Sequence, residues 1–307
     1  MRSGYTTFRQ QEQLFIREAP FVHLYSSPIE DGVLVENDED RKVVMNMLAL
    51  VSKELNLDVL AYAIMNNHIH LILKGDAIQG QAFFENLKKR LTRFLRAKGK
   101  ARFLAKFCCG TTQIQSLKQL RNEIAYVIRN PFVVVSDVNL FSYPWCSGYL
   151  YFNRMLPVLQ GIPGPKLSYR ERRKVTHTSD GIIPASLAVA DGMILPQSFV
   201  NYQLVETLFG DARQFLFWVL KNVEAQVEVA LSCGELPNMS DDELFLTVCT
   251  LSRENYGKHS AKELTDVEKK ELAVTMHNRY YASNAQIARL LGLQPSVVNT
   301  LYPLGAK

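Results

Sequence analysis

The chain has 307 residues, of which 47% are hydrophobic and 21% are charged, and its formal net charge is +5. This composition excludes a disordered chain and predicts a globular protein large enough for two domains. No apolar run is long enough to cross a bilayer, and the N-terminus has no signal-peptide core, so we expect no membrane partner. The five cysteines form no C-x-x-C pair, which argues against a zinc ribbon and indicates reduced thiols in a cytoplasm.

The first hundred residues alternate between β-prone and amphipathic segments. Strands are predicted at residues 21–25, 57–65, 68–74 and 102–108, and helices at 41–55, after an Asp38 cap, and at 81–98. The second and third strands are close enough in sequence to form an antiparallel hairpin. The resulting order, β-α-β-β-α-β, is the split βαβ arrangement of ferredoxin-like folds.

A third helix is predicted at residues 117–130, ended by Pro131, with one more edge strand at 132–135. The Gly- and Pro-rich residues 161–165 and the charged run 169–174 indicate a linker. We therefore predict an α+β domain at residues 1–158, a basic linker at 159–175 and an all-α domain at 176–307.

The last part of the chain has helical periodicity throughout. Helices are predicted at residues 199–209, 212–231 and 241–256, and then at 265–279, 285–291 and 296–301, with Gly292 in the last turn. The final segments match a helix-turn-helix at about residues 265–302, which would contact DNA, although an ordinary three-helix end has the same pattern.

Two histidines begin the third predicted strand. A strand has a side-chain period of two, so His68 and His70 leave the same face while Ile69 points the other way. Two neutral imidazoles on one face provide half of a metal site. A satisfied histidine in the core is the alternative.

Tyr126 and Asn130 are four residues apart on the third predicted helix and therefore share a face. A free phenol has a pKa of about 10, so tyrosine is a useful nucleophile only where a metal or cation assists. A core aromatic residue is the alternative interpretation of Tyr126.

These residues resemble a known family. The segment A-Y-A-I-M-N-N-H-I-H-L-I-L at 61–73, followed by A-Y-V-I-R-N-P at 125–131, is similar to single-tyrosine transposases of the HUH nuclease class, in particular the REP-associated tyrosine transposases. The resemblance covers about residues 10–155 and includes Y-P-W-C-S at 143–147. Asn66 stands where the family commonly has proline, which should loosen the turn, and Phe132 stands where a basic residue is frequent.

The resemblance implies a reaction and a site. His68, His70 and Asn130 would bind a divalent metal, Mg²⁺ or Mn²⁺, and Tyr126 would attack single-stranded, hairpin-containing DNA to leave a 5′-phosphotyrosine. Rejoining would reverse this step without an external energy source, and the sequence has no phosphate-binding G-x-x-x-x-G-K-[ST] loop. The resemblance also implies a protein of the bacterial cytoplasm that is associated with the nucleoid when it is bound to DNA. Either a homodimer or a monomer would fit.

Positive charge is concentrated on the second predicted helix and its exit. No acidic residue interrupts this run, and we expect it to contact DNA phosphates, although a solvated helix face is the ordinary alternative. The basic residues are Lys88, Lys89, Arg90, Arg93, Arg96, Lys98, Lys100 and Arg102.

Two other functions fit parts of the pattern. A metal hydrolase would need further His or Asp ligands, and His23, His177, His259 and His277 stand in no suitable motif. A catalytically inactive, domesticated transposase acting as a DNA-binding regulator would keep the fold without the chemistry. The retention of His68, His70 and Tyr126 favours the enzyme.

Overall fold

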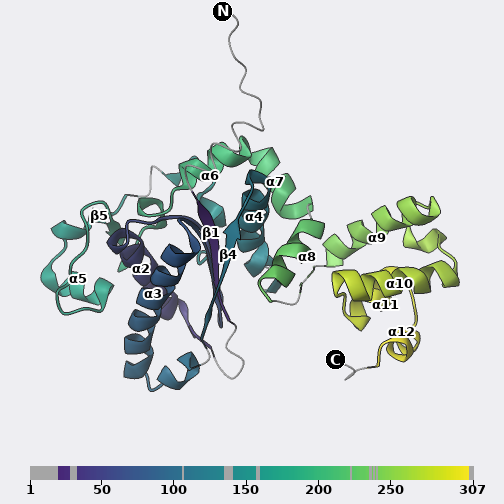
Figure 1. Ribbon diagram of the computed structural model, residues 1–307, viewed down its shortest axis with the longest axis horizontal. Coiled ribbons are helices and arrows are strands. Elements are labelled where there is room, and N and C mark those ends of the chain that lie inside the picture. Colours follow the sequence, from purple (N-terminus) through teal and green to yellow (C-terminus); the bar gives the residue numbers. More distant parts are fainter. Residues whose placement is uncertain are drawn as a thin grey trace, which may run out of the picture. The chain divides into compact units, whose positions relative to one another are not determined.

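The structure, a computed structural model, describes residues 20–27, 33–105, 107–134, 141–156, 160–221, 223–234, 237, 239 and 241–303. The chain divides into two compact units, Met1–Val219 and Leu220–Lys307. The first contains helices and antiparallel sheets, and the described elements of the second are helices, so the protein is α+β (Figure 1). Within the described residues, no helix combines the length and apolarity that a bilayer crossing requires.

A four-stranded sheet lies at the centre of the first unit. Its strands run in the order β2-β3-β1-β4, and all three neighbouring pairs are antiparallel. The register places Tyr25 opposite His70 and His23 opposite Ile72, so these side chains share one face. The strands are β1 (Phe21–Ser26), β2 (Asp58–Ile64), β3 (Ile69–Lys74) and β4 (Cys109–Ile114).

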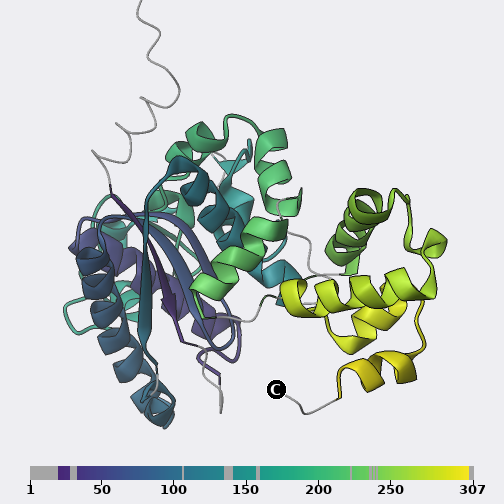
Figure 2. The same ribbon diagram turned by 45° about the vertical axis from the view of Figure 1, so that its right-hand side comes forward.

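Helices cover both faces of this sheet, as Figures 1 and 2 show. Helices α2 (Asp38–Glu54) and α3 (Ala77–Ala97) lie against one face, and α4 (Leu117–Val134) lies against the other. Strands buried on two sides need continuous apolar sequence, and β2 and β3 are almost entirely buried.

The observed element order along residues 21–134 follows the predicted order β-α-β-β-α-β, but the fourth strand is displaced. The segment predicted as a strand at 102–108 contains instead a 3₁₀ turn, Ala101–Leu104, and the strand begins at Cys109. The β-branched Thr111 and Thr112 pair with Leu24 and His23 of β1, which explains why the chain is extended there.

The prediction that Pro131 ends the third helix is wrong. Helix α4 continues through Pro131 to Val134, so the run predicted as an edge strand is helical as far as it is described. Val135 lies outside the described residues.

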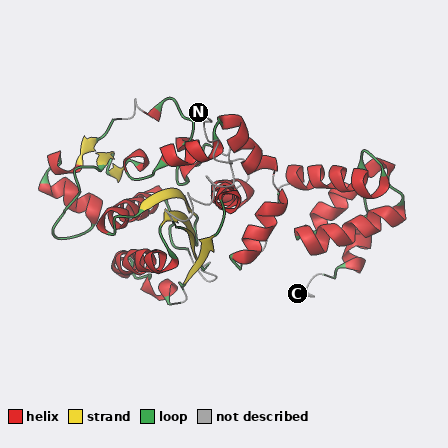
Figure 3. Ribbon diagram, turned by 45° about the horizontal axis from the view of Figure 1, so that its top comes forward, coloured by secondary structure: helices red, strands yellow, loops and turns green. Residues whose placement is uncertain are grey.

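The segment at residues 160–219 is also part of the first unit. It contains a small antiparallel sheet, coloured yellow beside the main one in Figure 3, whose strands are β5 (Ile162–Pro163), β6 (Ala188–Ala190) and β7 (Met193–Ile194). The buried Asn46 of α2 holds this sheet, because its amide donates to the Gly192 carbonyl oxygen and accepts from the Ile194 amide. The helices of this segment are α5 (Tyr169–Thr176), α6 (Tyr202–Phe209) and α7 (Ala212–Lys221).

The compact units therefore divide differently from the predicted domains. The predicted linker covered residues 159–175, a range in which the structure has most of a capped helix, α5, that contacts α2. The division instead falls between Val219 and Leu220, and the Gly- and Pro-rich residues 161–165 contain β5 and the start of a 3₁₀ turn within the first unit.

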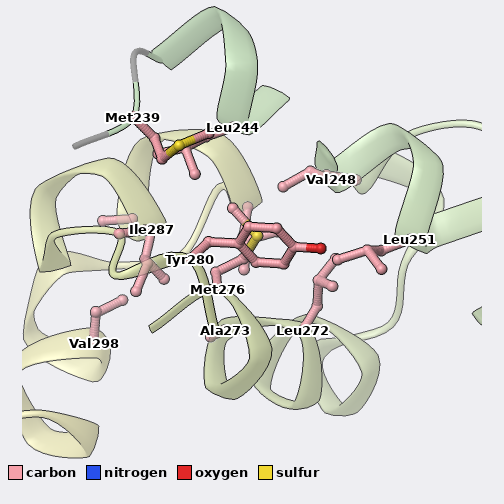
Figure 4. Packing of buried hydrophobic residues seen from close by; sticks show 14 of the residues in the cluster. Met239, Leu244, Val248, Leu251, Leu272, Ala273, Met276, Tyr280, Ile287 and Val298 are labelled. Carbon is pink, nitrogen blue, oxygen red and sulfur yellow. The ribbon is translucent and has the colours of Figure 1, made fainter. Parts of the chain in front are cut away.

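The second unit contains α8 (Val223–Ser232), α9 (Asp241–Tyr256), α10 (Asp266–Tyr280), α11 (Asn284–Leu291) and α12 (Pro295–Leu301). Leu244, Met276, Tyr280 and Ile287 are central to its apolar core, and Figure 4 shows how side chains from α9 to α12 meet there. Gly292 adopts a positive φ of 62° at the end of α11, a conformation that glycine allows without strain.

Candidate active site

His70 lies at the centre of the sheet face that α4 covers. The side chain is fully buried on β3, and its ring centroid is 5.0 Å from that of His68, which precedes the strand. The two imidazoles are therefore neighbours, as the period of two predicts. The Nδ1 atom of His68 is 2.7 Å from Oδ1 of the adjacent Asn67, so this ring is held through one nitrogen.

Helix α4 places Tyr126 and Asn130 over the same face. The ring of Tyr126 is 5.5 Å from that of His70, in an edge-to-face arrangement, and the Asn130 Nδ2 atom is 3.4 Å from His70 Nε2. Both residues are buried, with 6% and 7% of their surface exposed. The structure thus brings together His68, His70, Tyr126 and Asn130, the four residues that the sequence analysis named for the site.

Two further residues, His23 and Glu123, complete this cluster. His23 Nε2 lies 3.1 Å from His70 Nδ1, and its Nδ1 atom lies 2.7 Å from the Glu123 carboxylate. Both residues are fully or almost fully buried. The sequence analysis set His23 aside because it stands in no motif, and its closeness follows only from the pairing of β1 with β3. Glu123 precedes Tyr126 by three positions on α4, a spacing that could have identified it.

The turn that precedes His68 is tied to the rest of the unit. The Arg41 guanidinium donates to the Asn66 side chain, and the Asn66 carbonyl oxygen accepts from the Leu34 amide at 2.7 Å. On the neighbouring strand end, the Trp145 carbonyl oxygen accepts from the Ile64 amide, and the Trp145 indole donates to Asp38. The expected loosening of the turn by Asn66 is thus offset by contacts of its own side chain and backbone.

The residues present fit a divalent cation. Nδ1 of each imidazole has a hydrogen-bond partner in the protein, and Nε2 of His70 faces the Asn130 side chain at 3.4 Å. A neutral histidine that donates from Nδ1 offers Nε2 as its coordinating atom. The Oδ1 atom of Asn130 is buried and has no hydrogen-bond partner among the described residues, and a buried carbonyl of this kind suits a cation. In the described part of the chain, no group of three or more His, Cys, Asp or Glu side chains could hold a metal ion, and Asn130, an amide, falls outside that set of residue types.

The basic side chains of α3 fall into two groups. Arg90 pairs with Glu54, Lys98 pairs with Asp40, and Lys88 donates to the Phe107 carbonyl oxygen at 2.6 Å. No acidic residue interrupts the basic run itself, but α2 supplies these acidic partners from a distant part of the sequence. The exposed members outside these pairs are Lys89, Arg93 and Arg96.

Comparison with known proteins gives limited information. No protein-family model matches the chain, and no curated protein matches it. Among solved structures, the chain is similar to a REP-associated tyrosine transposase bound to a REP hairpin, with a TM-score of 0.36 and 15% sequence identity over 45% of this chain and 81% of that chain. A likeness at this level establishes neither activity nor mechanism, so a functional conclusion depends on the geometry of the site.

Proposed function

We propose that the chain is a metal-dependent, single-tyrosine DNA strand transferase that cleaves and rejoins single-stranded DNA. The observation that supports this most directly is the arrangement on α4. Tyr126 and Asn130 lie one helical turn apart, and both contact or adjoin the His70 ring. A nucleophile beside a set of nitrogen and oxygen ligands is the arrangement that phosphodiester transesterification requires.

In the proposed reaction, the Tyr126 hydroxyl oxygen attacks the scissile phosphorus. A bond forms between that oxygen and phosphorus while the bond to the 3′-oxygen breaks, and the phenolic proton is exchanged for one on the departing 3′-hydroxyl. The product is a 5′-phosphotyrosine. Attack by another 3′-hydroxyl reverses the step, so the phosphoester bond energy is conserved.

His68, His70 and Asn130 would hold the cation, Mg²⁺ or Mn²⁺, which when bound supplies positive charge to the scissile phosphate. The protein's own contribution is positioning. The rings of His70 and His23 lie 5.5 and 6.2 Å from the Tyr126 ring, and this packing limits the directions in which its hydroxyl can point.

Single-stranded or hairpin DNA is the proposed substrate, and the α3 side chains Lys89, Arg93 and Arg96 would contact its phosphates. The proposed ferredoxin-like assignment agrees with the observed strand order β2-β3-β1-β4. The helix-turn-helix at α10 to α12 is a second proposed DNA contact, but α12 has no charged residue, and residues 220–307 contain more acidic than basic side chains. We therefore assign phosphate binding to α3 first.

The test is incubation of the full chain with labelled hairpin-containing single strands and Mn²⁺ or Mg²⁺, followed by denaturing electrophoresis. We expect a covalent protein–DNA adduct from the wild type and none from Tyr126→Phe, which retains the ring but lacks the nucleophile. Absence of an adduct across a varied panel of hairpins, with DNA binding intact, would reject the transferase and favour the alternative of an inactive DNA-binding regulator.

A further inference from the structure

Three buried side chains form a continuous chain behind the proposed metal site. The Glu123 Oε2 atom is 2.7 Å from His23 Nδ1, and His23 Nε2 is 3.1 Å from His70 Nδ1. These residues come from α4, β1 and β3, and each is at most 1% exposed. Burying polar side chains is costly unless each finds a hydrogen-bond partner, and apolar residues would fill the same space, so packing alone does not account for this chain.

The chemistry of the acceptors fixes the direction of the hydrogen bonds. A carboxylate oxygen accepts and an imidazole N–H donates, and Glu123 also accepts from the Gln119 side-chain amide at 3.3 Å. The proton between Glu123 and His23 therefore belongs to His23 Nδ1. The neutral His23 then accepts at Nε2, and the matching donor is the Nδ1–H of His70.

This assignment leaves the lone pair of His70 on Nε2. That atom is the one that faces Asn130, at 3.4 Å from its side-chain nitrogen. His68 is held in the same way, because its Nδ1 atom lies 2.7 Å from the Asn67 oxygen. The Nδ1 atom of each imidazole thus has a hydrogen-bond partner in the protein. For His68 this partner is the Asn67 side chain, whereas for His70 it is His23, which in turn contacts Glu123.

We propose that Glu123 and His23 are positioning residues that fix the tautomer and orientation of His70, so that Nε2 is presented to a divalent cation. This inference rests on the proposed function in one respect, namely that the group bound by His70 is a divalent cation. Partners that orient a ligating histidine typically contribute 10- to 100-fold to metal affinity. Both residues are buried behind His70, and His23 contacts it directly, so their effect acts through His70.

The sharpest variant is Glu123→Gln. The Gln119 amide, whose own oxygen accepts from the Gln115 amide, donates to Oε1 of residue 123, so the new side chain keeps its oxygen there and points its N–H at His23 Nδ1. This reverses the chain: His23 would then donate from Nε2 to His70 Nδ1 and leave the His70 proton on Nε2. We expect the affinity for Mn²⁺, measured by calorimetry or by electron paramagnetic resonance without DNA, to fall about 10- to 100-fold. Glu85→Gln is the matched control, because it makes the same substitution at an exposed carboxylate of α3, and it should bind Mn²⁺ as the wild type does.

A second measurement needs no variant. Nitrogen-15 chemical shifts of the histidine rings in the metal-free wild type distinguish the two tautomers of His70. We expect the shift of an unprotonated nitrogen at Nε2 and of a protonated one at Nδ1. Protonation at Nε2 in the wild type would overturn the proposal even if Glu123→Gln does not fold.

The outcomes separate this proposal from the transferase itself. Folded Glu123→Gln with Mn²⁺ affinity within about twofold of the wild type would reject the positioning role, whether or not the wild type forms a DNA adduct. Loss of Mn²⁺ affinity in Glu123→Gln, without any adduct from the wild type, would support the positioning role and reject the transferase. A wild type that binds no Mn²⁺ would overturn the proposal, because His70 would then present Nε2 to no cation.

Discussion

The thiol of Cys146 lies 3.9 Å from the carbonyl oxygen of Val127. In a regular helix this oxygen would accept from the N–H of residue 131, but Pro131 has no N–H. The same sulfur is 3.7 Å from the Ile128 carbonyl oxygen. Burial raises the pKa of the Cys146 thiol to about 12, so it keeps its proton and can donate. This contact explains how α4 passes through Pro131, directly after the proposed ligand Asn130.

We therefore expect an isosteric pair of substitutions at Cys146 to differ in stability. Val and Thr have nearly the same shape, but only Cys146→Thr has a hydroxyl that can donate to the carbonyl oxygens of Val127 and Ile128. Thr should be the more stable by about 1 kcal/mol, measured by urea unfolding. A Val variant that is more stable than the Thr variant, as expected for a buried hydroxyl without an acceptor, would show that the thiol does not stabilise this turn of the helix.

The ring of Tyr25 crosses Gly110, its partner on β4. A Cβ at Gly110 would lie 2.2 Å from that ring, so Gly110→Ala must displace Tyr25, whose ring is 6.5 Å from that of His70. We expect a loss of about 1–3 kcal/mol in unfolding free energy.

Gly80→Ala is the matched control for Gly110→Ala. Its Cβ would meet the Val22 side chain at 3.2 Å, a much smaller clash, and alanine is the better helix former at this position in α3. Thermal unfolding of both variants should show the larger loss for Gly110→Ala. Equal losses would show that the Tyr25 ring yields at little cost.

Local spacing is sufficient to predict the part of the site that lies within single elements. The period of two in a strand places His68 beside His70, and the i to i+4 spacing of a helix places Tyr126 beside Asn130. No local rule reports that α4 covers this face of the sheet. The position of α4 depends on where β4 ends and how it connects to α4. The sequence analysis predicted the fourth strand at residues 102–108, whereas β4 is Cys109–Ile114.

His23 could not be found in this way because its partners are remote in sequence. It is 47 positions from His70 and 100 from Glu123, and only the register of β1 with β3 joins them. The small second sheet was also missed, although Asp191-Gly192 is a typical two-residue hairpin turn. Its strands are two or three residues long, too short for a recognisable alternation.

The two groups of basic side chains on α3 should differ in their effect on DNA binding. Gln substitutions at the exposed Lys89, Arg93 and Arg96 remove phosphate contacts, and each lost contact should reduce the slope of log affinity against log salt by about 0.7 for single strands. Fluorescence anisotropy with a labelled single strand, across a salt series, measures this slope.

The control for this prediction is Arg90→Gln, because Arg90 pairs with Glu54 of α2 and is mostly covered. This change should alter stability slightly and leave the salt slope close to that of the wild type. A slope that falls equally in both variants would indicate a diffuse charge effect rather than contacts along the exposed face of α3.

His177 should make the first unit less stable in mild acid. It ends α5 with a φ of 52° and packs edge-on against Phe94, at 5.8 Å between ring centroids. Partial burial lowers its pKa from the ordinary value of 6.5, so the unfolded chain binds a proton at a higher pH than the folded chain does. Stability is therefore lost as the pH falls below about 6.5 and stops falling once the folded state is also protonated.

His177→Asn removes this titration while keeping a side chain that tolerates a positive φ. The variant's unfolding temperature should decrease less than that of the wild type between pH 8 and pH 5, with the difference confined to the acidic side. His259→Asn, at an exposed histidine of the second unit, controls for the loss of one imidazole and should follow the wild type. Parallel curves for all three proteins would mean that burial of His177 contributes nothing to the acid sensitivity of the fold.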